Sequence, residues 1–437
     1  MHLLRSLLLA AMTFVISTVS AGAASLIRDA DIEYALGELA APVLQAAGLN
    51  PSRVRVLLVD DSSLNAFVID TRYIFIHTGL LQRLTSAGEL QAVIAHEAAH
   101  IANGHITRRM ANFRSAKTAA GIGMALAAVA AASGAGEAAV GFAAGAQSSA
   151  TRLFLAHTRA EEASADQSAV RFMARAGVDP RGAVKVMEMF SGQELLAEHR
   201  QDPYTRSHPL SRDRVRALNG FVTVYGKDLP EDPTAAYWFD RASGKLSGFT
   251  RAPAWTLRRA EESVSADITW MRRAAAYHRQ SNAAKALAAI DKSLSIRPGD
   301  PFYLDLKGQI QLESRQFANA VQTYAAAVKS SGNNAQVLGG YGRALLAVDQ
   351  PKNAIKVLEQ ARTRDYTDGR VLRDLAVAYA GTGQNAMASL VTAERYALNG
   401  RMKDAAIHAK RAAGALPQGS GPWQRAQDVL NAAKRAE

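Results

Sequence analysis

Residues 86–100 read SAGELQAVIAHEAAH, and their last five letters form the pattern H-E-x-x-H. Ser86 and Glu89 have the S-x-x-E spacing that is typical of a helix N-terminus. We therefore expect a helix that begins near Ala87 and carries His96. Histidines four positions apart on a helix lie about 40° apart around its axis, so both rings can reach one metal ion.

The chemistry of this pattern indicates a zinc hydrolase. His96 and His100 are the predicted zinc ligands, and Glu97 projects beside them. Glu97 can take a proton from water as that water attacks a polarised amide carbonyl. The alternative is two surface histidines beside a helix carboxylate. A chance occurrence of H-E-x-x-H is improbable in a chain with 10 histidines.

A catalytic zinc site needs a third protein ligand, and residues 158–166 (TRAEEASAD) offer one. Glu162 and Asp166 share one face of a predicted helix. Glu162 would bind zinc, and Asp166 would accept the free ring N–H of a ligand histidine. Glu161 is the rival ligand. In a further alternative, the acids lie on a solvated helix face and pair with Arg159.

Composition limits the remaining possibilities. The 437 residues suggest two or three domains, and 48% apolar with 21% charged residues is an ordinary globular balance. The absence of cysteine excludes disulfides, thiol catalysis and cysteine-built metal sites. A net charge of +12 comes with no recognisable nucleic-acid module, so we interpret it as surface charge and expect no nucleic-acid partner.

The N-terminus has the features of a cleaved secretory signal. Arg5 precedes an apolar run over residues 7–16, and Ala21 to Ala23 match the A-x-A cleavage pattern. The run is too short for a spanning helix, although a permanent anchor is the alternative. We expect residues 1–23 to be removed and the mature protein to lie in a bacterial periplasm.

Local patterns predict an α+β domain over residues 24–225. An apolar stripe predicts a helix at 31–48. Three short runs rich in Val, Ile and Phe, at 54–59, 65–69 and 73–77, predict the strands of a small sheet.

Two segments are less regular. Residues 118–146 are rich in Ala and Gly, and they fit either two closely packed helices or a membrane-dipping hairpin. The second interpretation would make the chain a membrane-resident protease. Residues 226–266 contain three prolines without a sustained period, and we interpret them as a connector.

Small residues recur every 34 positions in the C-terminal part. Trp270, Tyr277 and Pro298 occupy the Trp, Tyr and Pro positions of the tetratricopeptide pattern. The repeating small residues form two series: Ala286, Ala320, Ala354 and Ala388, and Ala274, Gly308, Gly342 and Ala376.

We therefore expect a repeat solenoid over residues 267–419 and a final helix at 420–437. A phase slip before the last unit leaves one extra helix near 370–382. The alternative is an irregular Ala-rich bundle. The repeats should fold without metal, and we expect no titratable cluster in their core.

HEAAH followed by R-x-x-E-x-x-A-D resembles metallopeptidase family 48, the gluzincins that include membrane-embedded CaaX prenyl proteases. The resemblance covers about residues 30–220. It implies a zincin-type α+β peptidase domain with a small sheet and an H-E-x-x-H helix, here followed by an all-α repeat solenoid. It also implies that Glu162, and not Glu161, is the third zinc ligand. The strand carrying Asn65 and Phe67 resembles the family's substrate-binding edge strand.

Three further residues need a role. His105 follows His100 by five positions, which on a continuous helix rotates it about 140° away, so we expect a core or hydrogen-bonding role. From sequence alone, His208 before Pro209 would be an exposed loop histidine. The family resemblance instead implies that His208 fills zinc's open position as a self-inhibiting latch. It also implies that Arg214 lies near the active site.

The signal, peptidase domain and repeats together resemble periplasmic protease-chaperones that assist the assembly of outer-membrane β-barrels. The resemblance implies one Zn²⁺ per chain. It implies unfolded or misassembled outer-membrane proteins as partners, and the barrel-assembly machinery as a further partner of the repeats. Membrane association would be peripheral. A non-proteolytic holdase or docking scaffold with a latched structural zinc site is the alternative.

Overall fold

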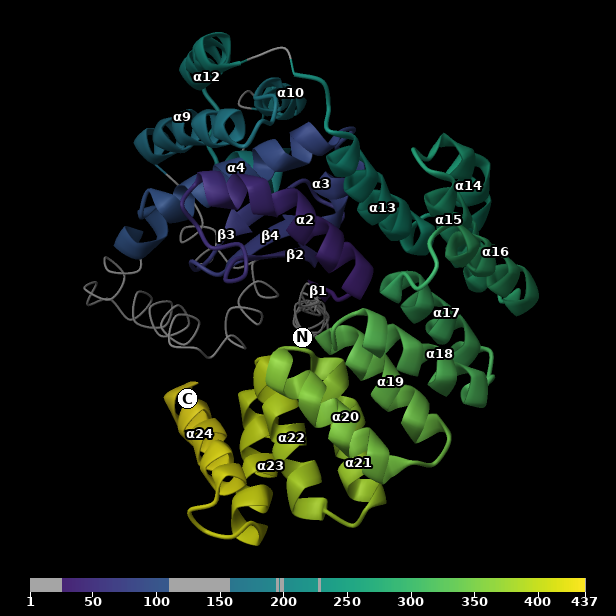
Figure 1. Cartoon of the computed structure of the whole chain (residues 1–437). Coiled ribbons are helices and arrows are strands. Elements are labelled where there is room, and N and C mark those ends of the chain that lie inside the picture. The colour runs from purple at the N-terminus through teal and green to yellow at the C-terminus, as the bar shows by residue number, and fades with distance from the viewer. Residues whose placement is uncertain (1–25, 110–157, 194–195, 197–199, 227–228, 437) are drawn as a thin grey trace, which may run out of the picture.

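The computed structural model describes residues 26–109, 158–193, 196, 200–226 and 229–436 (Figure 1). The predicted signal peptide (1–23) and the Ala- and Gly-rich segment 118–146 lie outside these residues. In the part of the chain that is described, no helix is both long and apolar enough to cross a membrane.

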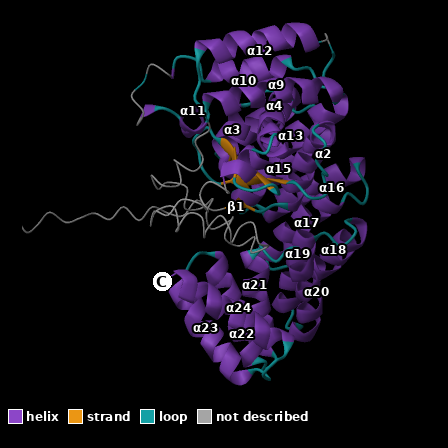
Figure 2. Ribbon diagram, turned by 90° about the vertical axis from the view of Figure 1, so that its left-hand side faces the viewer, coloured by secondary structure: helices purple, strands orange, loops and turns teal. Residues whose placement is uncertain are grey.

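The N-terminal half contains a small four-stranded sheet that lies among helices (Figure 2). Its strands are β1 (Leu26–Ile27), β2 (Arg55–Val59), β3 (Ala66–Val68) and β4 (Tyr73–His77), in the order β1-β2-β4-β3. β2 and β4 are parallel, and the other two pairs are antiparallel. The three predicted strands are confirmed. β1 was missed because two residues are too few to show a period.

Helices α2 (Ala30–Ala46) and α4 (Ala87–Ala102) pack with the sheet into one apolar core. The helix predicted to begin near Ala87 is confirmed, since the Ser86 hydroxyl accepts the Glu89 N–H at its start. The Glu89 carboxylate accepts the Thr85 N–H at 2.7 Å, one residue further out than an ordinary capping box. The remaining helices of this half are α3 (Thr78–Arg83), α9 (Arg159–Arg175), α10 (Arg181–Met189), α11 (Pro203–Ser207) and α12 (Arg212–Tyr225).

The C-terminal half is a chain of antiparallel helix pairs that sweeps in an arc from the N-terminal half to the C-terminus (Figure 1). Its helices are α15 (Ala266–Arg279), α16 (Ala283–Ile296), α17 (Pro301–Glu313), α18 (Phe317–Ser330), α19 (Ala335–Ala347), α20 (Pro351–Arg364), α21 (Gly369–Gly381), α22 (Asn385–Leu398), α23 (Met402–Ala415) and α24 (Gly421–Ala436). Helix α21 occupies the place where the extra helix was expected.

The repeated small residues lie where the two helices of a pair cross. A Cβ atom added at Gly308 would lie 2.8 Å from the Tyr324 ring, and one at Gly342 would lie 2.4 Å from Leu358. Both distances are too short for a larger side chain. Close helix crossing therefore explains the 34-residue series.

The predicted connector, residues 226–266, is largely helical. It contains α13 (Pro233–Thr250), α14 (Pro253–Arg259) and a short 3₁₀ turn (Ala260–Glu262). Pro233 and Pro253 stand in the first turn of these helices, where proline's missing N–H is harmless. The prolines therefore start helices rather than break them.

Helix α13 ties the two halves together through a fully buried arginine. Arg241 Nε lies 2.7 Å from Asp31 of α2, and its Nη2 lies 2.7 Å from Asp300 at the start of α17. In the first repeat, Asp267 is also buried and accepts the Tyr303 hydroxyl. The expectation of a repeat core without titratable groups was wrong, because these partners are distant in sequence.

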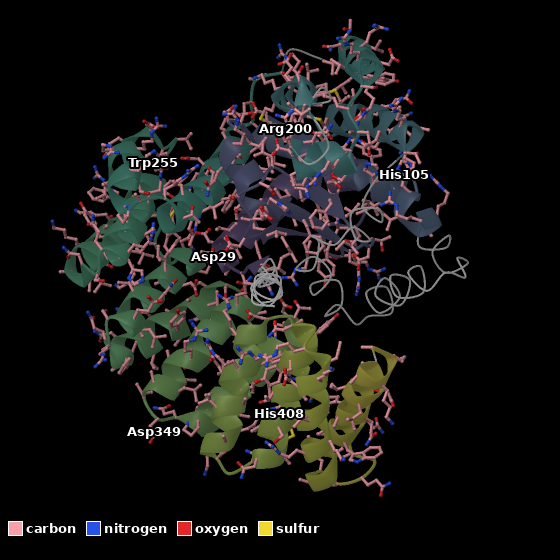
Figure 3. All side chains as sticks on the ribbon, turned by 180° about the vertical axis from the view of Figure 1, so that it is seen from behind. Asp29, His105, Arg200, Trp255, Asp349 and His408 are labelled. Carbon is pink, nitrogen blue, oxygen red and sulfur yellow. The ribbon has the colours of Figure 1, made fainter. Side chains whose placement is uncertain are left out.

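A second junction joins the N-terminal segment to the loop between α20 and α21. The Asp365 carboxylate contacts both Arg28, at 2.5 Å, and Arg55, at 3.0 Å. Asp29 lies between the two halves in Figure 3. Its carboxylate is 2.9 Å from Lys245 of α13. The N-terminal half and the repeats are thus joined by two ionic junctions, one through Arg241 and one through Asp365.

Candidate metal centre

The centre is built on α4, whose apolar residues hold it against the sheet and α9. His96, Glu97 and His100 are all buried on this helix. The Nε2 atoms of His96 and His100 lie 3.1 Å apart. One helical turn therefore brings two imidazole nitrogens to one point, as the spacing predicts.

Four side chains from three segments converge at this point. Nδ1 of His208 lies 3.3 Å from Nε2 of His96 and 3.0 Å from Oε1 of Glu162. Nε2 of His100 lies 3.3 Å from that same Glu162 oxygen. These four residues form the group able to hold a metal ion among the residues described.

The spacing of these donor atoms fits a small tetrahedral ion. Zinc–nitrogen and zinc–oxygen bonds of about 2.0–2.1 Å give a tetrahedron whose edges are about 3.3 Å long. Four of the distances between these donors run from 3.0 to 3.3 Å, and all four donor atoms lie within 4.8 Å of one another. Three imidazoles and a carboxylate are also a donor set that zinc prefers.

The first turn of α9 explains why Glu162 and not Glu161 faces the centre. Thr158 and Glu161 form a capping box, in which the Glu161 carboxylate accepts the Thr158 N–H and the Thr158 hydroxyl accepts the Glu161 N–H. This bonding occupies Glu161 at the helix end. Glu162 is buried and points inward. The T-x-x-E spacing was visible in the sequence and could have separated the two acids.

Asp166 and Arg214 contact the side chains of the donor group and hold them in position. Oδ1 of Asp166 lies 3.1 Å from Nδ1 of His96, which is the contact expected for a ligand histidine. Arg214 donates two hydrogen bonds to Asp166, at 2.8 and 3.0 Å. It also lies 2.9 Å from Glu162. Burial opposes the charged form of Asp166, but the His96 and Arg214 hydrogen bonds outweigh it and lower the pKa of this carboxyl.

Glu162 is likewise held as a carboxylate. Burial would raise the pKa of Glu162, but the electrostatic interaction with His208 and hydrogen bonds with the three histidine rings hold the pKa well below its usual range. An anionic ligand is therefore already present for a cation.

Glu97 differs from the other acids. It is fully buried, and neither of its carboxylate oxygens accepts a hydrogen bond from the described residues. Burial raises the pKa of Glu97. The nearest ring nitrogen, Nε2 of His208, lies 3.4 Å away. Burying a carboxylate without a hydrogen bond costs free energy of folding. Its presence here therefore indicates a function in the site.

His208 follows α11 and lies over the centre. Its Nε2 lies 3.3 Å from the carbonyl oxygen of Ala66 on β3, and its ring is 4.6 Å from the Tyr204 ring. The residue is buried, so the exposed loop position considered from sequence alone is wrong. Its imidazole occupies the fourth corner of the donor set.

His105 lies beside the centre but outside the donor group. Nδ1 of His105 is 2.9 Å from Nδ1 of His100. The expected rotation of 140° was wrong, because α4 ends at Ala102 and Gly104 reverses the chain with a φ of 71°. The hydrogen-bonding alternative fits this contact. Figure 3 labels His105 at the end of this segment.

The predicted edge strand needs a similar correction. β3 is at the edge of the sheet, as expected. However, the Asn65 carbonyl accepts the His77 N–H of β4, and Phe67 pairs with Phe75. Because backbone groups alternate along a strand, Ala66 rather than Asn65 or Phe67 turns its carbonyl to the open edge. The His208 contact lies on this open side.

The comparisons with known proteins match both halves of the chain. Residues 27–222 match Peptidase family M48, and residues 311–375 match Tetratricopeptide repeat. The chain thus carries a family M48 peptidase domain and tetratricopeptide repeats, which confirms the resemblance seen in the sequence.

The relatives share both parts. The chain is homologous to the Beta-barrel assembly-enhancing protease of Escherichia coli K12, with 23% identity over 396 residues, 88% of this chain and 79% of the relative. The Yersinia pestis protein of that name is 21% identical over 358 residues, 80% of this chain and 72% of its own length. The structure of MamA 41-end from Desulfovibrio magneticus RS-1 covers 39% of this chain and 95% of its own, at 17% identity and a TM-score of 0.31. The family and the homologues support a metallopeptidase.

Proposed function

We propose that this chain is a periplasmic zinc endopeptidase and chaperone that degrades or assists misassembled outer-membrane β-barrel proteins. The observation that carries the proposal is the convergence of His96, His100 and Glu162 beside the buried carboxylate of Glu97, which accepts no hydrogen bond from the described residues. This combination of a cation site and an adjacent base is suited to hydrolysis of an amide bond.

The three ligands would be His96, His100 and Glu162, with one zinc ion per chain. The chemistry that zinc supplies at such a site is polarisation of a carbonyl group and acidification of water. Glu97 accepts the proton from the attacking water and returns it to the leaving amine. Asp166 keeps the His96 ring in one tautomer, and Arg214 holds Asp166 in place.

In the resting protein His208 is a latch. Its ring lies beside His96, where a scissile carbonyl and the attacking water would have to bind. Its Nε2 atom contacts the Ala66 carbonyl on the open edge of β3. Displacing this ring would expose the donors His96, His100 and Glu162, which would hold the metal, together with the Ala66 carbonyl of β3. An extended substrate could then pair with the free edge of β3.

The repeats would select the substrate. Repeat solenoids present extended concave surfaces to protein partners. The name of the homologous proteases refers to β-barrel assembly. Outer-membrane proteins and the barrel-assembly machinery are therefore the proposed partners, reached after export through the N-terminal signal. Contact with the membrane would be peripheral.

A holdase with a structural zinc site is the second candidate. It is favoured by the fourth donor, His208, because structural zinc sites have four protein ligands and no open position. The buried Glu97 carboxylate beside the donors, without a hydrogen bond from the described residues, argues for an enzyme, since a structural site needs no base.

The test is digestion of a urea-unfolded outer-membrane β-barrel by the wild type and by Glu97→Gln. Removing a general base lowers the rate by about 100- to 10,000-fold. We expect this loss with an unchanged zinc content, because Glu97 is not a ligand. Equal cleavage by both proteins would contradict the role of Glu97 as the base. No cleavage by either the zinc-loaded wild type or His208→Ala would favour the holdase.

A further inference from the structure

The two histidines of the donor group on α4 have different partners behind their rings. His96 turns Nε2 to the centre, and its other ring nitrogen, Nδ1, lies 3.1 Å from the Asp166 carboxylate. His100 also turns Nε2 to the centre, where it lies 3.3 Å from Glu162. Nδ1 of His100 lies 2.9 Å from Nδ1 of a third histidine, His105. A carboxylate therefore lies behind one ring and an imidazole behind the other.

His105 belongs to a turn that is attached to α9. Gly104 reverses the chain after α4 in the left-handed region, with a φ of 71°, which favours glycine. The Asn103 amide donates to the carbonyl oxygen of Ser164 on α9, at 3.4 Å, and to its hydroxyl, at 3.1 Å. The His105 side chain is buried. The turn therefore holds the His105 ring against the ring of His100.

The contact between the two Nδ1 atoms limits which of them carries a proton. A hydrogen bond needs one donor and one acceptor, so one Nδ1 atom has a proton and the other has none. A neutral histidine binds a metal ion through the ring nitrogen that has no proton. Because His100 turns Nε2 to the centre, its Nδ1 is the donor. Nδ1 of His105 is then the acceptor, and the proton of the His105 ring lies on Nε2.

The imidazole partner differs from the carboxylate in charge. A ligand histidine usually donates its second N–H to a carboxylate, a backbone carbonyl or water. Asp166 follows this rule at His96 and places a negative charge there. His105 orients the His100 ring without adding charge, since it accepts as a neutral group. Without this acceptor, the buried His100 ring would be free to take the other tautomer, whose Nε2–H cannot bind a metal ion.

We propose that His105 is a positioning residue for His100. Its neutral ring accepts the Nδ1–H of His100 and holds that ring in the tautomer that presents Nε2 to the ion. His105 lies outside the donor group, so it acts only through His100. The inference rests on the proposed function, because it concerns the zinc site of the proposed enzyme.

The zinc affinity of the purified full-length protein tests this role without a measurement of activity. Competition with a chelating indicator gives the dissociation constant of each variant. His105→Leu has no acceptor and should weaken zinc binding by ~10- to 100-fold, the usual effect of removing the partner of a ligand histidine. His105→Asn should bind zinc as the wild type does, because the amide oxygen of asparagine can accept at the place of Nδ1.

Asn103→Ala is the matched control for the turn. It removes the hydrogen bonds between the turn and α9 but retains the His100–His105 contact, so it should keep the wild-type zinc affinity. Circular dichroism checks the folding of each variant. A loss in Asn103→Ala as large as that in His105→Leu would show that the turn, rather than the acceptor, supports the site. That result, or zinc binding by His105→Asn as weak as by His105→Leu, would overturn the proposal.

NMR spectroscopy of the wild type gives a test that depends on no variant's stability. In zinc-loaded protein with isotope-labelled histidine, long-range proton–nitrogen spectra distinguish a ring nitrogen that carries a proton from one that does not. The spectrum of His105→Asn identifies the signals of His105 by their absence. We expect the proton of His105 on Nε2 and that of His100 on Nδ1. A proton on Nδ1 of His105 would overturn the proposal.

These results are distinct from the test of proteolysis. Weakened zinc binding by His105→Leu, together with no cleavage by the zinc-loaded wild type or His208→Ala, would contradict the protease and retain the role of His105. Zinc binding by His105→Leu that equals that of the wild type would overturn this role and leave the protease intact.

Discussion

The metal centre and the junction of α2, α13 and α17 are both buried clusters of charged side chains. The metal centre has three histidines beside its one arginine, Arg214, whereas the cations of the junction are an arginine and a lysine. At the junction, Arg241 donates to Asp31 and Asp300, and Lys245 lies 2.9 Å from Asp29. At the metal centre, titratable histidines surround Glu162, while Glu97 has no hydrogen bond from the described residues.

The difference indicates which cluster has its carboxylates neutralised by side chains of the protein. Permanent cations neutralise the carboxylates of the junction, so this cluster serves to join the two halves. The histidine and glutamate donors point at one another at distances that suit an ion between them. Buried charges are retained only when they are paired or bind a metal. Among the described residues, the metal centre has a set of donors that could hold a metal ion, whereas the junction is paired through arginine and lysine.

The largest expected effect comes from the junction. Replacing Arg241 by methionine leaves Asp31 and Asp300 buried without their main partner, which should lower the free energy of unfolding by about 3–5 kcal/mol. Urea unfolding followed by circular dichroism measures it. Arg258→Met, at an exposed position on α14, is the control. A loss below ~1 kcal/mol would mean that the junction is not a stabilising cluster.

A smaller effect is expected at Asp365. Burial opposes the charged form of Asp365, but Arg28 and Arg55 outweigh it and depress the pKa of this carboxyl. Asp365→Asn should cost about 2 kcal/mol at pH 7, the scale of hydrogen bonds to charged groups. Asp404→Asn, in an exposed pair with Arg401, should change stability by less than ~1 kcal/mol.

The pH dependence of the Asp365 contribution has a definite sign. Because the folded-state pKa is depressed, the stabilisation is fully present above the ordinary aspartate value of ~3.9 and is lost as pH falls through the folded-state pKa. The gap between wild type and Asp365→Asn should therefore shrink below about pH 4. A gap that grows on acidification would contradict the ionic contact.

The smallest expected effect sharpens the account of the metal centre. If the latch is open in ~10% of molecules, His208→Ala should raise proteolysis of unfolded chains by up to ~10-fold, with zinc still held by three ligands. A fall of ~100- to 1,000-fold would instead identify His208 as an oxyanion donor. If proteolysis and zinc affinity were both unchanged in His208→Ala, His208 would be neither a latch nor an oxyanion donor.

Features that depend on neighbours along the chain could be predicted. His96, Glu97 and His100 follow from one helical turn, and the 34-residue period of small residues predicted the crossing helices. Which of Glu161 and Glu162 faces the centre also depends on neighbours along the chain, because Thr158 and Glu161 form a capping box. The spacing alone left that choice open, and the family resemblance favoured Glu162.

Features that depend on distant contacts could not be predicted. Arg241 lies 210 positions from Asp31 and 59 from Asp300, so no local pattern marks it as buried. The prolines of the connector suggested irregular chain, although Pro233 starts a helix. A cavity with mainly apolar walls lies beside the metal centre between helices α4, α9, α10 and α12. Only the packing of these helices brings its walls together.

The zinc content of purified full-length protein tests the central claim most directly. Inductively coupled plasma mass spectrometry should find one zinc ion per wild-type chain, a similar value for Glu161→Gln, and a clear loss for Glu162→Gln. Arg241→Met, if folded, should keep its zinc, because the junction is a separate cluster. A wild type without zinc, or a loss of zinc in Glu161→Gln with normal content in Glu162→Gln, would contradict the assignment of this centre.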